Sequence, residues 1–364
     1  MILHIVSPHN WTKEFLNYFE ENIPHNNAVV CLFDDGRVEY SNGEITETYL
    51  NAGAIENKIK LLDISVAVVQ HLTPIKKSFI VKYLPARIPI VWWMFGADLY
   101  NRFLSKKGYE LYAPQTLPFL KCTIPHQIKR DLFYLRERYY EAIILKRVIG
   151  VIPCDMPDYK LACEVIGRPV DLVFVTPYQD ILNLPLCTGH DILVCHSASL
   201  TNNHLYALDY MRKWEIGESE IYIPLSYNIQ SESYCTAVIE GFRETFGEKT
   251  HCLLEFESYN SYINRFLKYK IAVFATWRQE ALGNIEICFQ IGVKVMMSKH
   301  NPYYLYFKSI GLKVFALEEV ETKNDLEPLS EEDKIHNREV FYQIISERKE
   351  RFINDIKTYF SKFI

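Results

Sequence analysis

Short apolar segments alternate with helical patterns along most of the chain. Segments rich in Val, Ile and other apolar residues, bounded by turn residues, predict β-strands. In the first half of the chain we predict strands at 2–6, 28–33, 65–69, 88–95, 148–152 and 170–175. Helical spacing falls between several of them, for example at 11–20 and 129–146. This alternation is typical of a parallel sheet that is covered by helices.

A second series of the same kind follows the stretch 184–190, which contains Pro and Gly. We predict its strands at 192–195, 221–224, 251–254, 271–275 and 293–298, and its helices at 203–214, 231–246, 258–269 and 284–291. Two such series predict an α/β protein with two Rossmann-like domains that face each other across a cleft. We assign the first domain to 1–180, the second to 187–330, and the segment 331–364 to a helix that can pack back on the first domain.

Length and composition favour an ordinary globular protein. With 364 residues, of which 49% are hydrophobic and 23% charged, the chain can bury the cores of two domains. The most apolar stretches, 88–97 and 285–295, are shorter than the roughly 20 residues that a membrane-spanning helix needs. Pro8 interrupts the first apolar run before a signal peptide could form. The nine cysteines show no zinc spacing. We therefore expect reduced thiols, a cytoplasmic location and no metal site.

Basic residues are concentrated in one part of the chain. Residues 76–147 hold 14 Lys and Arg against 5 Asp and Glu, a net charge of +9, although the whole chain carries −5. Aromatic residues interleave with them. Such a block can attract pyrophosphate or an anionic membrane surface, or it can be a solvated basic face. We expect no nucleic-acid partner, because no nucleic-acid motif accompanies the charge. The expected membrane contacts are Lys76, Lys77, Lys106, Lys107, Lys129 and Arg130.

Several catalytic motifs are absent from the sequence. None of the 14 glycines has GxGxxG spacing after the first strand, and no GxxxxGK or GxSxG motif occurs. Dehydrogenase, nucleotidase and α/β-hydrolase activities are therefore disfavoured. There is also no DxD triplet, the acidic signature that holds a divalent cation in many sugar transferases.

Several stretches of the chain share the motifs of one protein family. They include 92–100 (WWMFGADLY), 192–204 (ILVCHSASLTNNH) and 223–227 (IPLSY). A longer match runs in order through Leu254-Glu255-Phe256, Tyr259, Arg278-Gln279, Gly283-Asn284, Gln290-Ile291-Gly292 and Asn301-Pro302. These motifs resemble those of the TDP-N-acetylfucosamine:lipid II N-acetylfucosaminyltransferases, glycosyltransferase family 56. The resemblance is good across 190–310 and present at 88–104 and 146–160.

The resemblance implies the glycosyltransferase-B (GT-B) fold, with an N-terminal acceptor domain and a C-terminal donor domain. It further implies transfer of a deoxyamino sugar from a nucleotide diphosphate to a lipid-pyrophosphate-linked saccharide, in bacterial surface polysaccharide or antigen synthesis. The enzyme would be peripheral at the inner face of the cell membrane and would need no cofactor. Two departures from the family's pattern, Ala281 and Glu286, leave the donor sugar open.

Candidate donor-binding residues lie at the strand ends and helix starts of the second domain. They are Ser197, Asn203, Tyr227, Phe256, Tyr259, Arg278, Gln279, Gly283, Asn284 and Glu286. A guanidinium such as Arg278 can hold diphosphate oxygens through its fork of N–H groups, and Ser197 precedes a predicted helix whose N-terminus can bind phosphate. Glu286 stands in an apolar helix, where it could bind the donor or pair with Arg278. The aromatic residues could stack on the base or belong to the core.

Three residues of the first domain are candidate general bases. Asp98 follows the apolar strand 88–95 and the Gly96-Ala97 turn, where a carboxylate can accept the proton of an acceptor hydroxyl. It could equally be the N-cap of a helix that starts near Leu99. His71 and His9, each after a predicted strand, are the alternatives.

We therefore predict a metal-independent glycosyltransferase. One alternative is a catalytically silent relative that binds a saccharide or serves as a scaffold, and it would hydrolyse no nucleotide sugar. A nucleotide-sugar epimerase is a further alternative, for which one domain would hold the whole catalytic site.

Overall fold

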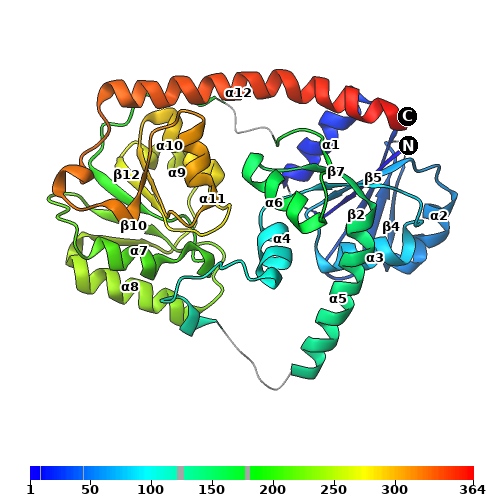
Figure 1. Ribbon diagram of the computed structural model, residues 1–364, viewed down its shortest axis with the longest axis horizontal. Helices are drawn as coiled ribbons and strands as arrows, with labels where there is room; N and C mark the ends of the chain where they lie inside the picture. The colour runs from blue at the N-terminus through cyan, green and yellow to red at the C-terminus, as the bar shows by residue number, and fades with distance from the viewer. Residues whose placement is uncertain (9, 44, 121–126, 177–180) are drawn as a thin grey trace. The chain divides into compact units, whose positions relative to one another are not determined.

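The computed structural model describes residues 1–8, 10–43, 45–120, 127–176 and 181–364 (Figure 1). The chain forms two compact units. Unit 1 consists of Met1–Leu104, Thr123–Pro177 and Arg348–Ile364, and unit 2 consists of Ser105–Cys122 and Tyr178–Glu347. Each unit has its own predominantly parallel sheet, so the predicted α/β class is confirmed.

The sheet of unit 1 has the strand order β4-β3-β2-β1-β5-β6-β7-β8 among the described residues. Its strands are β1 (Ile2–Val6), β2 (Asn27–Leu32), β3 (Val38–Ser41), β4 (Thr46–Tyr49), β5 (Val66–Gln70), β6 (Ile90–Trp93), β7 (Val148–Ile152) and β8 (Asp171–Leu172). All pairs are parallel except β2 with β3 and β3 with β4. The strand order reverses between β1 and β5, and the chain leaves both strands at their carboxyl ends.

The β3–β4 hairpin was not among the predicted strands. Its turn contains Asn42-Gly43, a pair that favours a tight hairpin because Gly43 can adopt a positive φ, here +87°. The strands are short and carry few apolar residues, and β4 is exposed or half-exposed throughout. These two strands therefore lack the apolar run from which the other strands were predicted.

Helices and apolar side chains cover the sheet of unit 1. The helices are α1 (Asn10–Asn22), α2 (Glu56–Leu61), α3 (Pro74–Tyr83), α4 (Ala97–Leu99), α5 (Gln127–Arg147) and α6 (Met156–Ile166). On one face, Phe15 and Phe19 of α1 share a buried cluster with Val66 and Val68 of β5. Packing of this kind holds the strand ends of unit 1 in fixed positions.

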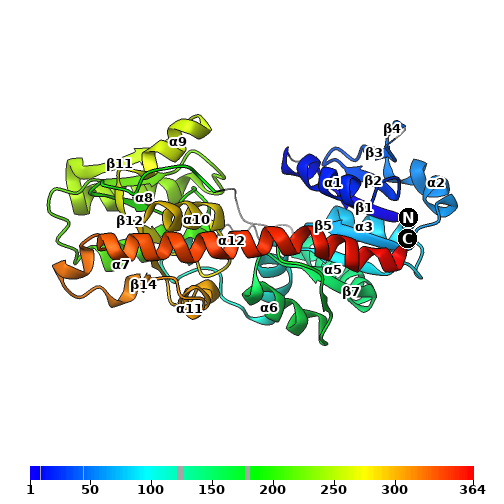
Figure 2. The ribbon, with the colours of Figure 1, turned by 90° about the horizontal axis from the view of Figure 1, so that it is seen from above.

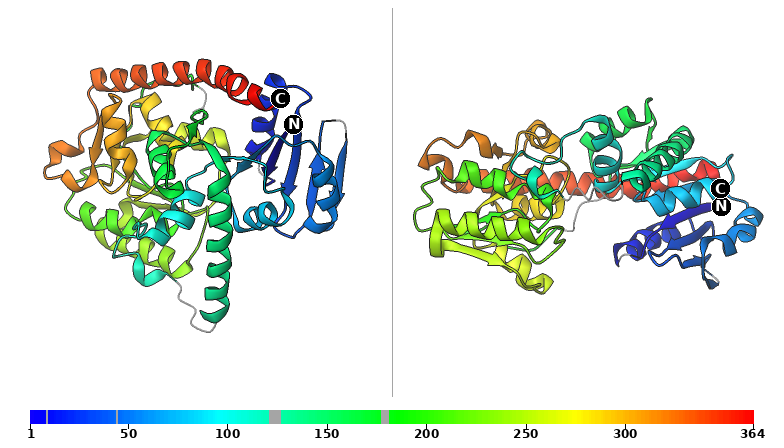
Figure 3. Two further views of the ribbon diagram at one scale, coloured as in Figure 1. Left: turned by 45° about the vertical axis from the view of Figure 1, so that its right-hand side comes forward. Right: turned by 90° about the horizontal axis from the view of Figure 1, so that it is seen from below.

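Helix α12 (Glu331–Phe360) contributes its last part to unit 1. Phe352 packs edge-on against Tyr18, with ring centroids 5.1 Å apart, and against Phe174 at 4.8 Å. Arg348 forms a salt bridge of 2.7 Å with the fully buried Asp155. The two termini lie close together in unit 1 (Figure 1, Figure 2 and Figure 3).

Two of the basic residues expected at a membrane surface are instead buried in unit 1. Lys76 and Lys77 have no exposed surface. The ammonium of Lys77 lies 2.5 Å from a carboxylate oxygen of Glu141 and 3.4 Å from one of Glu137. That of Lys76 donates to the carbonyl oxygen of Gln70. The prediction was wrong for this pair because a charge count cannot distinguish a buried ion pair from a solvated face.

The other expected membrane contacts are divided between the units. Lys106 and Lys107 belong to unit 2, where Lys107 is exposed and Lys106 is half-buried. The side chains of Lys129 and Arg130 lie outside the described residues.

The sheet of unit 2 has the order β11-β10-β9-β12-β13-β14, and all its pairs are parallel. The strands are β9 (Asp191–Val194), β10 (Ile221–Pro224), β11 (Thr250–Leu253), β12 (Tyr269–Phe274), β13 (Lys294–Met297) and β14 (Val314–Ala316). Five of these match the predicted series. The order reverses between β9 and β12, which makes their carboxyl ends the switch point of this sheet.

Two helical layers enclose the sheet of unit 2 (Figure 1). On one face α7 (His204–Met211) and α8 (Glu232–Phe246) pack against Ile192, Val194 and neighbouring strand residues. On the other face lie α9 (Tyr259–Phe266), α10 (Leu282–Ile291), α11 (Pro302–Ser309) and the first part of α12. Because successive side chains of a strand point to opposite faces of the sheet, each strand contributes residues to the cores on both faces.

Residues 105–122 pack with unit 2 although they stand between segments of unit 1 in the sequence. Asn203 holds this segment in place. Its side-chain oxygen accepts hydrogen bonds from the amide of Ala113 (2.9 Å) and the hydroxyl of Thr116 (3.0 Å), and its amide group donates to the carbonyl oxygen of Leu111 (3.2 Å). One buried side chain thus joins the segment to the start of α7.

Candidate functional site

The predicted donor-binding residues of unit 2 follow the carboxyl ends of neighbouring strands. Ser197 comes after β9, Tyr227 after β10, Phe256 after β11 and Arg278 after β12. Because the strands are parallel, these loops share one edge of the sheet. The amide of Ala198 donates to the carbonyl oxygen of Tyr227 (2.8 Å), which joins two of the loops directly.

A cluster of polar side chains spans the switch point between β9 and β12. Arg278 is 7% exposed, and its Nη2 lies 3.1 Å from Oε2 of Glu280 and 3.4 Å from the hydroxyl of Thr201. The Thr201 hydroxyl in turn donates to the same Glu280 oxygen at 2.6 Å. Arg278 Nη1 donates to the carbonyl oxygen of Gln279 (2.8 Å). We call Thr201, Arg278, Glu280 and His196 the Arg278 cluster.

His196 completes the Arg278 cluster from the loop after β9. Its Nε2 lies 4.0 Å from Oε1 of Glu280. Burial lowers the pKa of His196, and this effect outweighs the opposing attraction of the Glu280 charge. The imidazole is therefore neutral at pH 7, and Arg278 carries the positive charge of the cluster.

Some polar atoms in and beside the Arg278 cluster have no hydrogen-bond partner within the described parts of the chain. They are Nε of Arg278 and Nε1 of Trp277. A buried polar group without a partner costs about 1–3 kcal/mol, so such groups are normally satisfied by water or a ligand. Unpaired donors at this edge of the sheet could bind acceptor atoms of a polar ligand.

Two of the predicted residues in the loop after β9 are occupied by contacts within the protein. Ser197 is 1% exposed and accepts a hydrogen bond from Asn202 (2.9 Å). Asn203 has no exposed surface, and its side chain holds residues 111–116 as described above. These contacts give both side chains a structural role, so their predicted contact with a donor stays a prediction.

Helix α10 begins beside the Arg278 cluster. Ala281, with φ of +64°, turns the chain into the helix, and the half-buried Gly283 and Asn284 form its first turn. Asn284 accepts a hydrogen bond from the hydroxyl of Tyr262 (2.9 Å). Glu286 is 5% exposed within this helix. The sequence offered Glu286 as an ion-pair partner of Arg278, whereas the ion pair that Arg278 forms here is with Glu280.

The predicted aromatic residues are exposed. Tyr227 is 64%, Phe256 84% and Tyr259 61% exposed, at the ends of β10 and β11 and the start of α9. They are therefore not core residues, which was the alternative in the sequence. Exposed aromatic rings beside a polar cluster can stack on a planar ligand.

Asp98 in unit 1 is fully buried. Its carboxylate accepts hydrogen bonds from the amide of Leu72 (2.9 Å), the indole of Trp92 (2.8 Å) and the amide of Phe95 (3.0 Å). These bonds join the carboxyl ends of β5 and β6. Asp98 is not the N-cap of α4, whose cap position is Gly96. The bonds identify a structural role, and the general-base role of Asp98 stays a prediction.

His71 lies directly after β5 at the same edge of the unit 1 sheet. It is half-buried, its φ is +50°, and its ring packs edge-on near Phe95 with centroids 6.4 Å apart. Its neighbour Leu72 donates to Asp98, so the Asp98 bonds help to fix the position of His71. The third candidate base, His9, lies outside the described residues.

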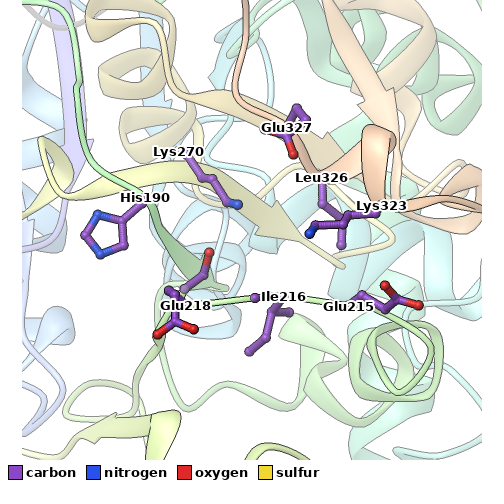
Figure 4. Close-up of a pocket in the computed structure, with 10 residues that line it drawn as sticks. His190, Glu215, Ile216, Glu218, Lys270, Lys323, Leu326 and Glu327 are labelled. Atoms are coloured by element: carbon purple, nitrogen blue, oxygen red, sulfur yellow. The ribbon is translucent and has the colours of Figure 1, made fainter.

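One pocket of unit 2 lies at the amino ends of the strands, opposite the Arg278 cluster. It has a volume of about 240 Å³, and His190, Lys270 and Lys323 are among its lining residues (Figure 4). Glu215, Glu218 and Glu327 also line it. Open α/β sheets bind their ligands at the carboxyl ends of the strands, so this pocket is not the candidate site.

The described residues contain no group of three or more His, Cys, Asp or Glu side chains that could hold a metal ion. In the same part of the chain, no helix is long and apolar enough to cross a membrane.

Glu280, Thr201 and His196 were not among the predicted site residues. Glu280 directly follows Arg278-Gln279, so an acidic residue two positions after a candidate arginine was a usable signal. Thr201 and His196 gave no such signal, because only the fold brings the loop after β9 next to the loop after β12.

Comparison with known families supports the predicted resemblance. Residues 176–336 match the model of the 4-alpha-L-fucosyltransferase family, glycosyltransferase group 56. The match begins just before the second segment of unit 2, Tyr178–Glu347, and includes the Arg278 cluster. The predicted family resemblance is therefore confirmed over this segment.

Solved structures with a similar fold include glycosyltransferases. Sucrose-phosphate synthase from Thermosynechococcus elongatus aligns with a TM-score of 0.59 at 8% identity, over 99% of this chain and 100% of that chain. The E. coli trehalose-6-phosphate protein bound with UDP-2-fluoro glucose gives 0.59 at 8%, over 98% and 99%. The UDP-forming α,α-trehalose-phosphate synthase from Burkholderia vietnamiensis gives 0.58 at 8%, over 100% and 99%. These similarities confirm the GT-B fold, and the family match with this fold supports sugar transfer from a nucleotide donor.

Proposed function

We propose that this glycosyltransferase binds the diphosphate of its nucleotide-sugar donor at the Arg278 cluster. The observation that carries the proposal is the buried guanidinium at the switch point of unit 2, with its Nε unpaired among the described residues. A guanidinium in a protected site binds phosphate oxygens strongly. The N-terminus of α10 at the same edge adds partial positive charge. Unit 2, which includes the segment 105–122, then acts as the donor domain and unit 1 as the acceptor domain.

The proposed reaction is attack of an acceptor hydroxyl on the anomeric carbon of the donor sugar. The bond between that carbon and the diphosphate oxygen breaks, and the nucleotide diphosphate leaves with the electron pair. Arg278 stabilises the charge that develops on the leaving group. The proton of the acceptor hydroxyl passes to a base of unit 1, for which His71 and Asp98 are the candidates within the described residues.

Glu280 is the partner that a bound diphosphate would replace at Arg278. In the structure its carboxylate neutralises Arg278. A bound diphosphate would compete for the same guanidinium, and the carboxylate would then be available to accept a hydrogen bond from a ribose or sugar hydroxyl. Tyr227, Phe256 and Tyr259 are exposed beside this edge and would stack on the nucleotide base.

The proposal is tested by measuring nucleotide diphosphate binding with Arg278→Ala. We expect the Kd to rise at least tenfold and transfer to fall more steeply. Arg278→Ala also leaves Glu280 without its counter-ion, so Arg278→Ala/Glu280→Gln serves as the variant that removes both charges. Arg212→Ala, an exposed arginine at the end of α7, is the control. Unchanged binding by folded Arg278→Ala would remove Arg278 from the site.

We propose that transfer needs no divalent metal ion. The support is the absence of a DxD triplet together with the guanidinium and helix N-terminus that can take over the stabilisation of the diphosphate. Activity is therefore expected to survive EDTA. A loss of activity that Mg²⁺ or Mn²⁺ restores would contradict the proposal.

We propose that the acceptor is a lipid-pyrophosphate-linked saccharide and that the protein docks on the inner face of the membrane through α5. The described part of α5 has an exposed face that carries both apolar and basic side chains. These residues are Leu135, Arg136, Arg138, Tyr139 and Lys146. Leu135 and Tyr139 are each 62% exposed and one helical turn apart. Basic residues beside exposed apolar ones suit the surface of an anionic bilayer.

Sedimentation with liposomes tests the docking proposal. Each basic residue near an anionic surface contributes on the order of 1 kcal/mol, screened over about 10 Å at 0.1 M salt. We expect binding to anionic but not neutral vesicles at low salt, release as salt rises, and loss of binding in Arg136→Glu/Arg138→Glu/Lys146→Glu. Arg212→Glu/Lys213→Glu on unit 2 is the control. Equal binding to neutral and anionic vesicles would refute docking by this face.

A further inference from the structure

Unit 2 contains a second hollow beside the Arg278 cluster, between the segment 105–122 and the end of β12. Its volume is about 350 Å³. Three aromatic residues, Tyr109, Tyr112 and Trp277, line it together with Leu111, Pro114 and Leu117. All of these residues belong to unit 2. The volume lies within the range of about 300–1,000 Å³ that is typical of small-molecule sites.

The walls of this aromatic pocket are held by specific bonds. The hydroxyl of Tyr109 donates to the carbonyl oxygen of Trp277 (2.8 Å), which joins the two sides. The side chain of Asn203 binds Leu111 and Ala113 through their main-chain atoms. The segment that forms one wall is therefore fixed to the body of unit 2 before any ligand binds, which reduces the entropic cost of binding.

Trp277 forms a rigid part of the wall. Its ring stacks on His300 with centroids 3.9 Å apart and an interplanar angle of 16°, and Tyr206 packs against it edge-on at 5.5 Å. Trp277 is 5% exposed, and its indole N–H has no hydrogen-bond partner in the described ranges. A buried donor without a partner in a pocket wall is a second indication of a polar ligand.

The aromatic pocket adjoins the Arg278 cluster. Trp277 directly precedes Arg278 in the chain. Burial raises the pKa of the Tyr112 hydroxyl, and the charges of Arg278 and Glu280 also act on it, in opposite directions. Tyr112 is thus within electrostatic reach of the group proposed to hold the donor diphosphate.

We propose that this aromatic pocket binds the pyranose ring of the donor sugar. A pyranose has apolar C–H faces, which pack on aromatic rings, and a rim of hydroxyl or amide groups, which need polar partners. The pocket offers both, since Ser105 and Glu110 complete its lining beside the tyrosines. The inference rests on the proposed function, because it assumes a donor diphosphate at Arg278.

The experiment compares the affinity of free and sugar-bearing nucleotides by calorimetry. The probes are UDP and dTDP, each alone and as its glucose and N-acetylglucosamine esters. In the wild type, the sugar ester of the nucleotide that binds should bind more tightly than the free diphosphate. Tyr112→Ala should weaken the ester at least tenfold while changing the Kd of the free diphosphate less than twofold. Tyr112→Phe keeps the ring, so it should retain most of the stacking contribution.

Control variants and further measurements distinguish a failure of the sugar assignment from a failure of the proposed function. Leu305→Ala, an exposed apolar residue on α11, should change neither affinity, and thermal unfolding checks that each variant is folded. Equal weakening of ester and free diphosphate by Tyr112→Ala would overturn the sugar assignment. An unchanged donor Kd with a raised KM for the acceptor would assign the pocket to the acceptor and likewise overturn it. If the wild type binds no nucleotide diphosphate, the proposed function itself fails.

Discussion

Replacing Asp98 by Asn distinguishes a structural carboxylate from a catalytic one. In the structure two donors, the Leu72 amide and the Trp92 indole, share Oδ2, and the Phe95 amide binds Oδ1. An Asn side chain has one oxygen, so its NH₂ group must face at least one of these N–H groups. The substitution therefore removes one or two hydrogen bonds and leaves buried donors unpaired.

The expected loss of stability follows from these contacts. A buried donor left without an acceptor costs about 1–3 kcal/mol, and hydrogen bonds to a charged group are at the upper end of the range. We expect Asp98→Asn to lower the free energy of unfolding by about 2–4 kcal/mol. For a unit of this size, that corresponds to a decrease in Tm of roughly 5–12 °C. Lys76, which is buried and attracted by the Asp98 charge, would lose part of its stabilisation as well.

The assay measures Tm and the rate of sugar transfer for the same preparations, at a temperature where all variants are folded. Asp63→Asn, at an exposed position of unit 1, is the control. A structural Asp98 predicts reduced stability with transfer lowered by less than tenfold, whereas His71→Gln should lower transfer strongly. The structural reasoning is refuted if Asp98→Asn keeps the wild-type Tm and lowers transfer by about 100-fold or more, as removal of a general base does.

Two further predictions concern buried polar side chains. Burial lowers the pKa of His4 to about 4 and that of His204 to about 3. As the pH falls below about 6.5, these two histidines therefore take up protons in the unfolded chain before they do so in the folded protein. Stability should therefore fall as the pH decreases from 6.5 to 4, and His4→Gln should flatten this decrease in urea unfolding; an equally steep decrease would contradict it. Asn203→Ala should lower stability by about 2–4 kcal/mol and speed proteolysis within 105–122, because three hydrogen bonds to that segment are lost. An unchanged cleavage rate would show that other contacts hold the segment.

The overall architecture could be predicted because it depends on local patterns. Buried parallel strands read as short apolar runs, as in β1 and β12, and the intervals between them have helical spacing. The β3–β4 hairpin could not be predicted from apolar runs because its strands are short and largely polar, although the Asn42-Gly43 turn was a usable signal.

The partners of the individual side chains could not be predicted from local patterns. Arg278 was singled out from its place after a strand, but its bond to Thr201 joins two loops that are 77 residues apart in sequence. For the same reason Asn203 looked like a ligand residue, because its bonds to the segment 105–122 cannot be seen in the sequence. Lys77 similarly pairs with Glu141, 64 residues away.

The construction of unit 1 from three separate chain segments has a consequence for its biosynthesis. Domains generally fold as units, the N-terminal one first during synthesis. Here Ile356 and Phe360 of α12 are fully buried in the core of unit 1, yet they are translated after all of unit 2. A nascent chain that has completed β1 to β8 therefore still exposes the apolar surface that α12 will cover. Unit 2 ends at Glu347 and can therefore complete its core first. Unit 1 begins earlier in the chain but completes its core last.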